Sequence, residues 1–211
     1  MNLLSLLESG LAELGLELDA DQKKRLLDFV ELLAKWNKSY NLTAITDPQK
    51  MLYYHLLDSL AIFQQVKPGQ VLLDVGSGAG LPGIPLAIAI PGSKWTLLDS
   101  NGKKTRFMQQ ALAMCGIDNA RVVKSRVQDY DAPQPIDIIV SRAYASIGHY
   151  VTSVAHLCGV HTRLLTLKTG LDPAEKQTLD SNKYLIQETE LQVPGIAEKR
   201  SLVSIRQRPH E

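Results

Sequence analysis

The 211-residue sequence has little that would indicate a metal site, a disulfide framework or a membrane span. It contains two cysteines and five histidines, and the histidines show no spacing typical of metal ligands. No stretch approaches the roughly 20 apolar residues that a membrane-spanning helix needs. The segment MNLLSLLESGLAELG lacks the basic region and the cleavage site of a signal peptide. We therefore expect a cytoplasmic protein with reduced thiols, no metal and no membrane contact.

An excess of one charge is also missing. The sequence has 23 Lys and Arg residues against 22 Asp and Glu residues, a formal net charge of +1. The charge balance by itself therefore identifies no polyanionic partner, although a local basic face could still bind one. No internal repeat or low-complexity tract divides the chain, and its length fits one principal domain with an appendage.

The order of apolar patterns predicts helices first and a sheet afterwards. Helical periodicity occupies 3–14, 19–36 and 47–63, and the segment WNKSYNLTAI between the last two has no periodicity. After Gly69, short apolar runs alternate with amphipathic stretches, which is typical of a parallel α/β sheet. Strands are predicted at 70–75, 94–98, 120–124, 135–141, 163–168, 183–191 and 199–207, and helices at 82–90, 101–115, 145–158 and 172–180.

These elements predict a mostly parallel seven-stranded sheet of the Rossmann-like kind. The last two strands have no helix between them, so they are expected to pair as an antiparallel hairpin. We divide the chain into an N-terminal helical extension, 1–66, packed on the core, and a cofactor-binding α/β domain, 67–211.

A glycine-rich turn follows the first predicted strand, in the stretch LLDVGSGAGLPGIPLAI. Gly76, Gly78 and Gly80 can adopt positive φ and let backbone amides approach a ligand without a Cβ in the way. Pro82 lies in the first turn of the next helix. Asp99 ends the second strand, where a carboxylate can accept hydrogen bonds from both ribose hydroxyls or can cap the following helix. The pattern indicates a nucleotide-type cofactor at a helix N-terminus.

The dinucleotide fingerprint G-x-G-x-x-G would require glycine where this sequence has Leu81. The turn has G-x-G-x-G instead, with Asp74 two residues ahead, and resembles the first motif of class I S-adenosylmethionine-dependent methyltransferases. That resemblance implies a class I methyltransferase fold whose loop wraps the methionine and sulfonium part of the cofactor. A turn without a ligand and an NAD-type oxidoreductase remain alternatives.

Five segments together make the resemblance sharper: WNKSYNLTAI, HLLDSL, DVGSGAGLPGIPLAI, LLDSNGKKTRF and VSRAYAS, in this order. They look like the glucose-inhibited division protein B family, bacterial methyltransferases of the small-subunit ribosomal RNA. The resemblance covers nearly the whole chain. It implies methylation of guanine N7 in 16S ribosomal RNA, S-adenosyl-L-methionine as the cofactor, and the small ribosomal subunit or its RNA as the partner. We expect a monomer. A ribosome-binding module without catalytic activity is the alternative.

The resemblance also implies site residues. The cofactor contacts of the family fall on Gly76, Leu81, Val127, Gln128 and Arg142, with backbone groups of the first two holding the amino-acid end. Val127 and Gln128 would read the adenine edge, and Gln128 departs from the glutamate of many relatives. We assign Arg142 the catalytic role as well, because it follows a buried strand whose carboxyl end should open into the cleft.

Other polar residues give weaker signals. Lys168 ends the strand RLLTLK, and His55 and Asp58 share a helix face as a structural pair or a substrate contact. With Trp36 and Tyr40, the local basic clusters could form a phosphate-binding and base-stacking rim around the cleft, or they could be solvated surface. The clusters consist of Lys35, Lys38, Lys103, Lys104, Arg106, Arg121, Lys124, Arg126, Lys199, Arg200, Arg206 and Arg208.

The expected chemistry needs no general base. Guanine N7 has a lone pair and no proton, so alignment for in-line attack on the sulfonium methyl group suffices. The sequence has no Asn-Pro-Pro-aromatic stretch of the kind that exocyclic-amino methyltransferases carry, and neither cysteine lies at a strand end as a nucleophile.

Overall fold

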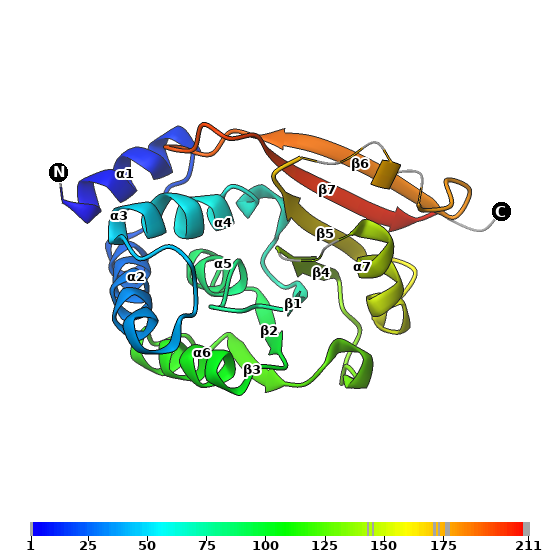
Figure 1. The fold of residues 1–211 in the computed structure, drawn as a ribbon, viewed down its shortest axis with the longest axis horizontal. Coiled ribbons are helices and arrows are strands. Elements are labelled where there is room, and N and C mark those ends of the chain that lie inside the picture. The colour runs from blue at the N-terminus through cyan, green and yellow to red at the C-terminus, as the bar shows by residue number, and fades with distance from the viewer. Residues whose placement is uncertain are drawn as a thin grey trace.

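The computed structural model describes residues 2–142, 144, 146–170, 172, 174–175 and 178–208. A seven-stranded sheet crosses the molecule in the order β3-β2-β1-β4-β5-β7-β6 (Figure 1). Neighbours among β1 to β5 pair in parallel, and β7 runs antiparallel between β5 and β6. The strands are β1 Val71–Val75, β2 Lys94–Asp99, β3 Ala120–Lys124, β4 Ile138–Ser141, β5 Arg163–Lys168, β6 Tyr184–Leu191 and β7 Arg200–Gln207. The predicted parallel sheet with its antiparallel C-terminal hairpin is confirmed.

Helices lie on both faces of this sheet, and the helices before β1 gather on the side of α5 and α6 (Figure 1). No helix in the described ranges is long and apolar enough to cross a membrane. The helices are α1 Leu3–Glu13, α2 Ala20–Tyr40, α3 Pro48–Met51, α4 Asp58–Leu60, α5 Gly83–Ala89, α6 Gly102–Met114 and α7 Ile147–Val154, with a π-helical turn at Leu52–Leu57 and 3-10 turns at Phe63–Gln65, Val127–Asp129 and Ala155–Leu157.

The second helix is longer than its apolar periodicity predicts. α2 continues to Tyr40, so the first half of WNKSYNLTAI is helical rather than irregular. Asn41 ends the helix in the left-handed conformation at φ 51, and its N–H donates to the carbonyl of Asn37. The side chain of Asn37 then donates to the carbonyl of Ile45 and accepts from the N–H of Thr43. These polar contacts, which periodicity does not detect, fix the turn after the helix.

Two other predicted helices differ in detail. The helix expected at 47–63 is interrupted by the π-helical turn Leu52–Leu57, which shifts the side chains that follow it. The helix expected at 172–180 lies partly outside the described residues, because 173, 176 and 177 are not described.

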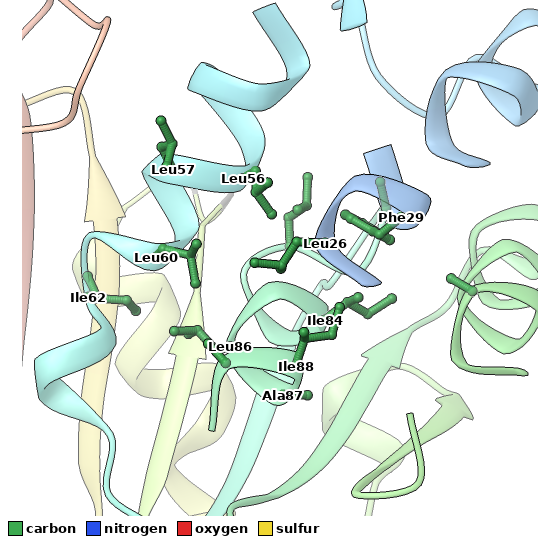
Figure 2. Packing of buried hydrophobic residues seen from close by; sticks show 14 of the residues in the cluster. Leu26, Phe29, Leu56, Leu57, Leu60, Ile62, Ile84, Leu86, Ala87 and Ile88 are labelled. Carbon is green, nitrogen blue, oxygen red and sulfur yellow. The ribbon is translucent and has the colours of Figure 1, made fainter. Parts of the chain in front are cut away.

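The core is formed mainly between the sheet and the N-terminal helices. Side chains of α2, the π-helical turn and α5 interdigitate there, including Leu26, Phe29, Leu56 and Ile84, all with no exposed area (Figure 2). A second cluster lies under α7, where Tyr150 is fully buried. Among the helices before β1, α2 packs on α5 and α6, and α4 packs on α5. The turn from Tyr54 to Asp58 brings polar groups to Arg142, which follows the carboxyl end of β4. The division of the chain at 66/67 stays a prediction.

The sheet order also determines where a ligand can lie. β1 pairs with β2 on one side and with β4 on the other, and the chain crosses over after β3. Ligands of open α/β sheets bind outside the carboxyl ends of the strands at such a reversal of strand order. The carboxyl ends of β1, β2 and β4 carry the glycine turn, Asp99 and Arg142.

Candidate functional site

The glycine turn is held by backbone hydrogen bonds to β2 and within itself. The N–H groups of Gly76 and Ser77 both donate to the carbonyl of Leu98, at 2.8 and 3.0 Å. The N–H of Leu81 donates to the carbonyl of Ser77 at 2.9 Å. Because the amides of Gly76 and Leu81 are already engaged, a cofactor could use only their carbonyl oxygens, which accept hydrogen bonds from an ammonium group.

Positive φ is confirmed at Gly76, Gly78 and Gly80, with values of 69°, 59° and 80°. The space around the three glycines differs. No described atom lies within 4 Å of a Cβ built at Gly76, whereas a Cβ at Gly80 would meet Cδ1 of Ile84 at 2.3 Å. Gly76 therefore borders open space as expected, but Gly80 is required by packing against α5 and not by room for a ligand.

The variant Gly80→Ala is expected to lower the free energy of unfolding by about 3 kcal/mol, from left-handed backbone strain and overpacking against Ile84. Gly15→Ala is the matched control, because Gly15 has φ 66 and no described atom near its Cβ position. It should cost only about 1 kcal/mol of strain. Urea unfolding of both variants measures the difference, and equal losses would contradict the role of Ile84.

Asp99 is buried, with both carboxylate oxygens bound to backbone amides. Oδ2 accepts from the N–H of Gly78 at 2.9 Å and Oδ1 accepts from the N–H of Asn101 at 2.8 Å. The alternative that Asp99 caps the following helix is wrong, because Asn101 caps α6 and accepts from the N–H groups of Lys103 and Lys104. Asp99 ties the glycine turn to β2, and each of its oxygens keeps a lone pair for a ligand.

A cavity of about 370 Å³ opens beside this turn. It brings together four of the predicted cofactor residues, Gly76, Asp99, Val127 and Gln128. Gly78, Gly80 and Leu81 do not line it, and Leu81 is 3% exposed within the core. The remaining lining residues, which the sequence did not single out for the cofactor, are Val75, Leu98, Ser100, Lys104, Ser125, Arg126 and Tyr144.

Arg142 lies in a second cavity of about 440 Å³. Lys168, the weaker sequence candidate, lines it too, and Tyr144 lines both cavities. Arg142 does not line the first cavity, so its cofactor contact stays a prediction. The other residues around the second cavity are Ile45, Tyr54, His55, Asp58, Leu167, Thr169, Gly170 and Arg200.

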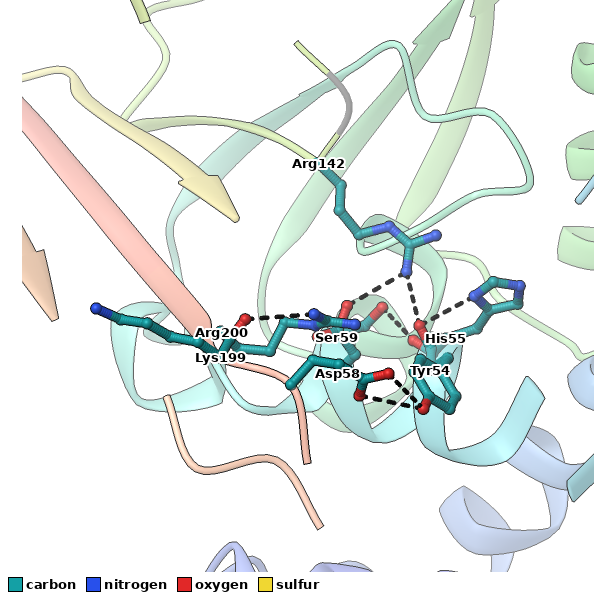
Figure 3. Close-up of polar contacts among 8 residues, drawn as sticks. Tyr54, His55, Asp58, Ser59, Arg142, Lys199 and Arg200 are labelled. Atoms are coloured by element: carbon teal, nitrogen blue, oxygen red, sulfur yellow. Dashed lines mark hydrogen bonds and ion pairs between the residues drawn. The ribbon is translucent and has the colours of Figure 1, made fainter. Parts of the chain in front are cut away.

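The second cavity contains a network of two arginines and one carboxylate (Figure 3). Nη1 of Arg142 donates to the carbonyl of Tyr54 at 3.2 Å and lies 3.5 Å from Oδ2 of Asp58. Nε of Arg200 donates to Oδ1 of Asp58 at 3.2 Å. Burial raises the pKa of Asp58, and the charges of Arg142 and Arg200 oppose this rise. Burial likewise lowers the pKa of Arg142 against the charges of Asp58 and Asp74.

His55 and Asp58 do not form the structural pair that their spacing suggested. Nδ1 of His55 lies 3.0 Å from the carbonyl of Tyr54, and Nε2 lies 2.8 Å from Oγ1 of Thr43. The carbonyl can only accept, so Nδ1 carries the proton and Nε2 accepts from the threonine hydroxyl in the neutral ring. Burial and then the charge of Arg142 lower the pKa of His55 to about 4.

This lowered pKa predicts acid destabilisation. Unfolded histidine binds its proton near pH 6.5 and folded His55 near pH 4, so folding stability falls as the pH drops between these values. The free energy of unfolding lost through protonation of His55 over this pH range is about 3 kcal/mol. Chemical denaturation at pH 7 and pH 4.5 should show the stability difference between the wild type and His55→Gln shrinking in acid. The exposed His161→Gln is the control, and parallel curves for wild type and His55→Gln would contradict the prediction.

Asp74 belongs to β1, and its side chain contacts the first residue of α5. Its Oδ2 accepts from the N–H of Gly83 at 3.0 Å, and among the described residues its Oδ1 has no hydrogen-bond partner. Burial raises the pKa of Asp74 to about 7. The sequence used this residue only to separate two cofactor motifs, whereas the structure shows that it anchors the helix behind the turn.

The basic clusters do not all lie at the carboxyl ends of the parallel strands, where the two cavities open. Arg200 starts β7 beside the carboxyl end of β5. Because β7 runs antiparallel to β5, Arg206 lies beside the amino end of β5, away from the cavities. Arg121 near the start of β3 donates to Thr96 and Tyr130. The expected rim therefore excludes Arg121, Arg206 and Arg208. Trp36 and Tyr40 stack with ring centroids 5.0 Å apart.

Among the residues that the sequence did not single out, Tyr54 lies in the predicted helix 47–63 and Tyr144 lies in the segment VSRAYAS. Arg200 was noted only as one basic residue among many. Their contacts join segments far apart in the sequence, so spacing gave no signal for them. Within the described ranges, no group of three or more His, Cys, Asp or Glu side chains could hold a metal ion.

Comparison with known proteins identifies the family of this sequence. The sequence matches the family described as "GidB: rRNA small subunit methyltransferase G" over residues 22–203. Relatives named "Ribosomal RNA small subunit methyltransferase G" include one from Alkalilimnicola ehrlichii, 46% identical over 202 residues, which are 96% of this chain and 91% of the relative. Another, from Nitrosococcus oceani, is 46% identical over 204 residues, which are 97% of this chain and 95% of the relative.

Solved structures with low identity share the fold. A tRNA (m1A58) methyltransferase from Aquifex aeolicus superposes with a TM-score of 0.59 at 14% identity, over 73% of this chain and 69% of that one. A SAM-dependent methyltransferase from the same organism gives 0.56 at 16% identity, over 82% and 96%. The predicted class I methyltransferase fold is confirmed.

The family is one of methyltransferases, so the alternatives of an NAD-type oxidoreductase and of a module without catalytic activity are set aside. Gly76 with its open side and Asp99 with its remaining lone pairs fit S-adenosylmethionine, the cofactor that membership implies. From residue 22 to residue 203, and at 46% identity to curated relatives, the chain belongs to the GidB family of rRNA small subunit methyltransferases G.

Proposed function

We propose that this protein transfers the methyl group of S-adenosylmethionine to N7 of a guanine in small-subunit (16S) ribosomal RNA. The observation that carries the proposal is the pair of cavities joined by Tyr144. One cavity holds four of the predicted cofactor residues and the other holds Arg142, so a cofactor and a base could meet between them. The names of the relatives indicate ribosomal RNA as the substrate.

The cofactor residues are assigned by the chemistry of their free groups. S-adenosylmethionine supplies a methyl group bound to a positively charged sulfur. The carbonyl oxygen of Gly76, which lines the first cavity, would accept from its ammonium group, since the amide of Gly76 is engaged. Asp99 would accept from the ribose hydroxyls. Val127 and Gln128 would hold the adenine, with the neutral amide of Gln128 accepting a weaker hydrogen bond than glutamate would.

Methyl transfer to N7 would proceed without a general base. The lone pair of guanine N7 forms the new bond while the electrons of the carbon–sulfur bond remain on sulfur, and no proton leaves the base. The contacts of the second cavity support this proposal, because Asp58 is bound by two guanidiniums and both ring nitrogens of neutral His55 are engaged. Arg142 would orient the guanine through O6 or an adjacent phosphate.

Methylation of RNA by the purified protein tests the proposal. The protein is incubated with labelled S-adenosylmethionine and either small ribosomal subunits or their naked RNA. Borohydride and aniline cleavage, which cuts RNA at N7-methylguanine, should then locate one labelled guanine. Label in neither substrate, or label at another atom, would refute the proposed activity. Light scattering of the purified protein alone checks the expected monomer.

A further inference from the structure

Asp58 connects two arginines that come from different strands of the sheet. Arg142 follows β4 and Arg200 starts β7, and β5 lies between these strands. Each guanidinium meets a different oxygen of the Asp58 carboxylate, at 3.5 Å for Arg142 and 3.2 Å for Arg200. The Asp58 side chain is only 7% exposed. One buried carboxylate from the N-terminal helices therefore determines how far apart the two guanidiniums lie.

The helical turn before Asp58 reinforces this arrangement. The carbonyl of Tyr54 accepts from Nη1 of Arg142, and the ring of Tyr54 lies 5.9 Å from Cζ of Arg200. The hydroxyl of Tyr54 donates to the carboxylate of Glu198 at 3.2 Å, close to Arg200 in the sequence. Figure 3 shows Arg142 and Arg200 approaching this turn from two sides. The turn from Tyr54 to Asp58 thus orients both arginines.

Donor groups of the two arginines remain available. In the described part of the chain, the hydrogen bonds of Arg142 engage Nη1, and those of Arg200 engage Nε and Nη1. The guanidinium is rigid and planar, so fixing one nitrogen also fixes the direction of the others. Both side chains line the 440 Å³ cavity and retain some exposure, 25% for Arg142 and 13% for Arg200.

The charges of the network indicate what it would bind. The side chains of Arg142, Arg200 and Asp58 together carry one positive charge in a largely buried setting, which one phosphodiester would balance. Paired guanidinium groups recognise phosphate oxygens through directed, charge-assisted hydrogen bonds. Without the carboxylate, the two arginines would repel each other and turn toward water.

We propose that Asp58 is a positioning residue that holds Arg142 and Arg200 as a pair, and that their remaining N–H groups bind one backbone phosphate of the RNA substrate. This inference rests on the proposed function, because it takes RNA as the substrate. It assigns the N-terminal helices a part in the substrate site through a residue that touches neither the cofactor nor the RNA.

The variant Asp58→Asn tests the proposal, since it keeps the size of the side chain and removes its charge. Equilibrium binding is measured between about 50 and 200 mM salt, with small subunits or naked RNA, whichever the wild type methylates. We expect affinity for RNA to fall about tenfold. The negative slope of log affinity against log salt should become less steep by about one unit, as for one lost phosphate contact. Affinity for S-adenosylmethionine should stay within about twofold, because Asp58 does not line the cavity of Gly76, Asp99 and Gln128.

The control Asp28→Asn removes another ion-paired aspartate of the N-terminal helices, which lies 2.6 Å from Lys24 on an exposed face. It should leave RNA affinity and the salt slope unchanged. Arg200→Gln should lower the salt slope as Asp58→Asn does, and the double variant should lower it no further, because Asp58 acts through the arginines.

An unchanged salt slope in Asp58→Asn would overturn the proposal. Equal weakening of RNA and cofactor binding together with a loss of stability would also overturn it, since that pattern indicates a purely structural role. If Asp58→Asn does not fold, an unchanged salt slope in Arg200→Gln refutes the phosphate contact. Wild-type protein that neither binds nor methylates RNA would refute the proposed function instead.

Discussion

Replacing Arg142 with glutamine is expected to lower the rate of methyl transfer by a factor on the order of 100 to 1,000, the usual cost of losing one oriented donor in an active site. Arg142 is held by the carbonyl of Tyr54 and by Asp58, and it faces the cavity next to the predicted cofactor residues. Glutamine cannot supply the charge or the fork of donors that would orient a guanine or its phosphate. Single-turnover rates with labelled S-adenosylmethionine measure the loss.

The same variant separates two roles that the sequence assigned to Arg142. Because Arg142 does not line the cavity of Gly76 and Asp99, calorimetry should give a cofactor affinity close to that of the wild type. Arg163→Gln is the control, since Arg163 lies at the amino end of β5 and donates to Gln65. A large loss of cofactor affinity in Arg142→Gln would show that Arg142 acts mainly on the cofactor.

The variant Asp99→Ala is expected to weaken S-adenosylmethionine binding by about 3 kcal/mol, or roughly a hundredfold. The carboxylate would hold the ribose hydroxyls, and it also accepts from the N–H of Gly78, so its removal loosens the glycine turn. Isothermal titration calorimetry measures the change. The matched control is Asp118→Ala, an exposed aspartate before the amino end of β3.

A second substitution divides the two contributions of Asp99. In Asp99→Asn the amide oxygen can still accept from Gly78, but the charge that strengthens hydrogen bonds from the ribose is gone. An affinity between those of the wild type and Asp99→Ala is expected. Unchanged affinity in Asp99→Ala would remove Asp99 from the cofactor site.

The sequence alone predicted the features that depend on neighbouring residues. Short apolar runs between amphipathic stretches predicted the positions of the strands, because a parallel sheet buried between helices has apolar side chains on both faces. The glycines at 76, 78 and 80 predicted a left-handed turn, since positive φ is a local steric property. Periodicity was less reliable where polar side chains end a helix, and α2 therefore continues to Tyr40 beyond its predicted end.

Only the tertiary structure decided which distant residues share a site. Asp58 meets Arg142 and Arg200 across 84 and 142 positions of the chain, and no spacing rule encodes such contacts. The antiparallel insertion of β7 beside β5 brings Arg200 to the cavity and sends Arg206 to the other edge. The sequence determined the secondary structure and the cofactor turn through local sterics and hydrophobic periodicity. The pairing of strands and the packing of the N-terminal helices, which depend on contacts closed over long loops, determined the composition of the second cavity.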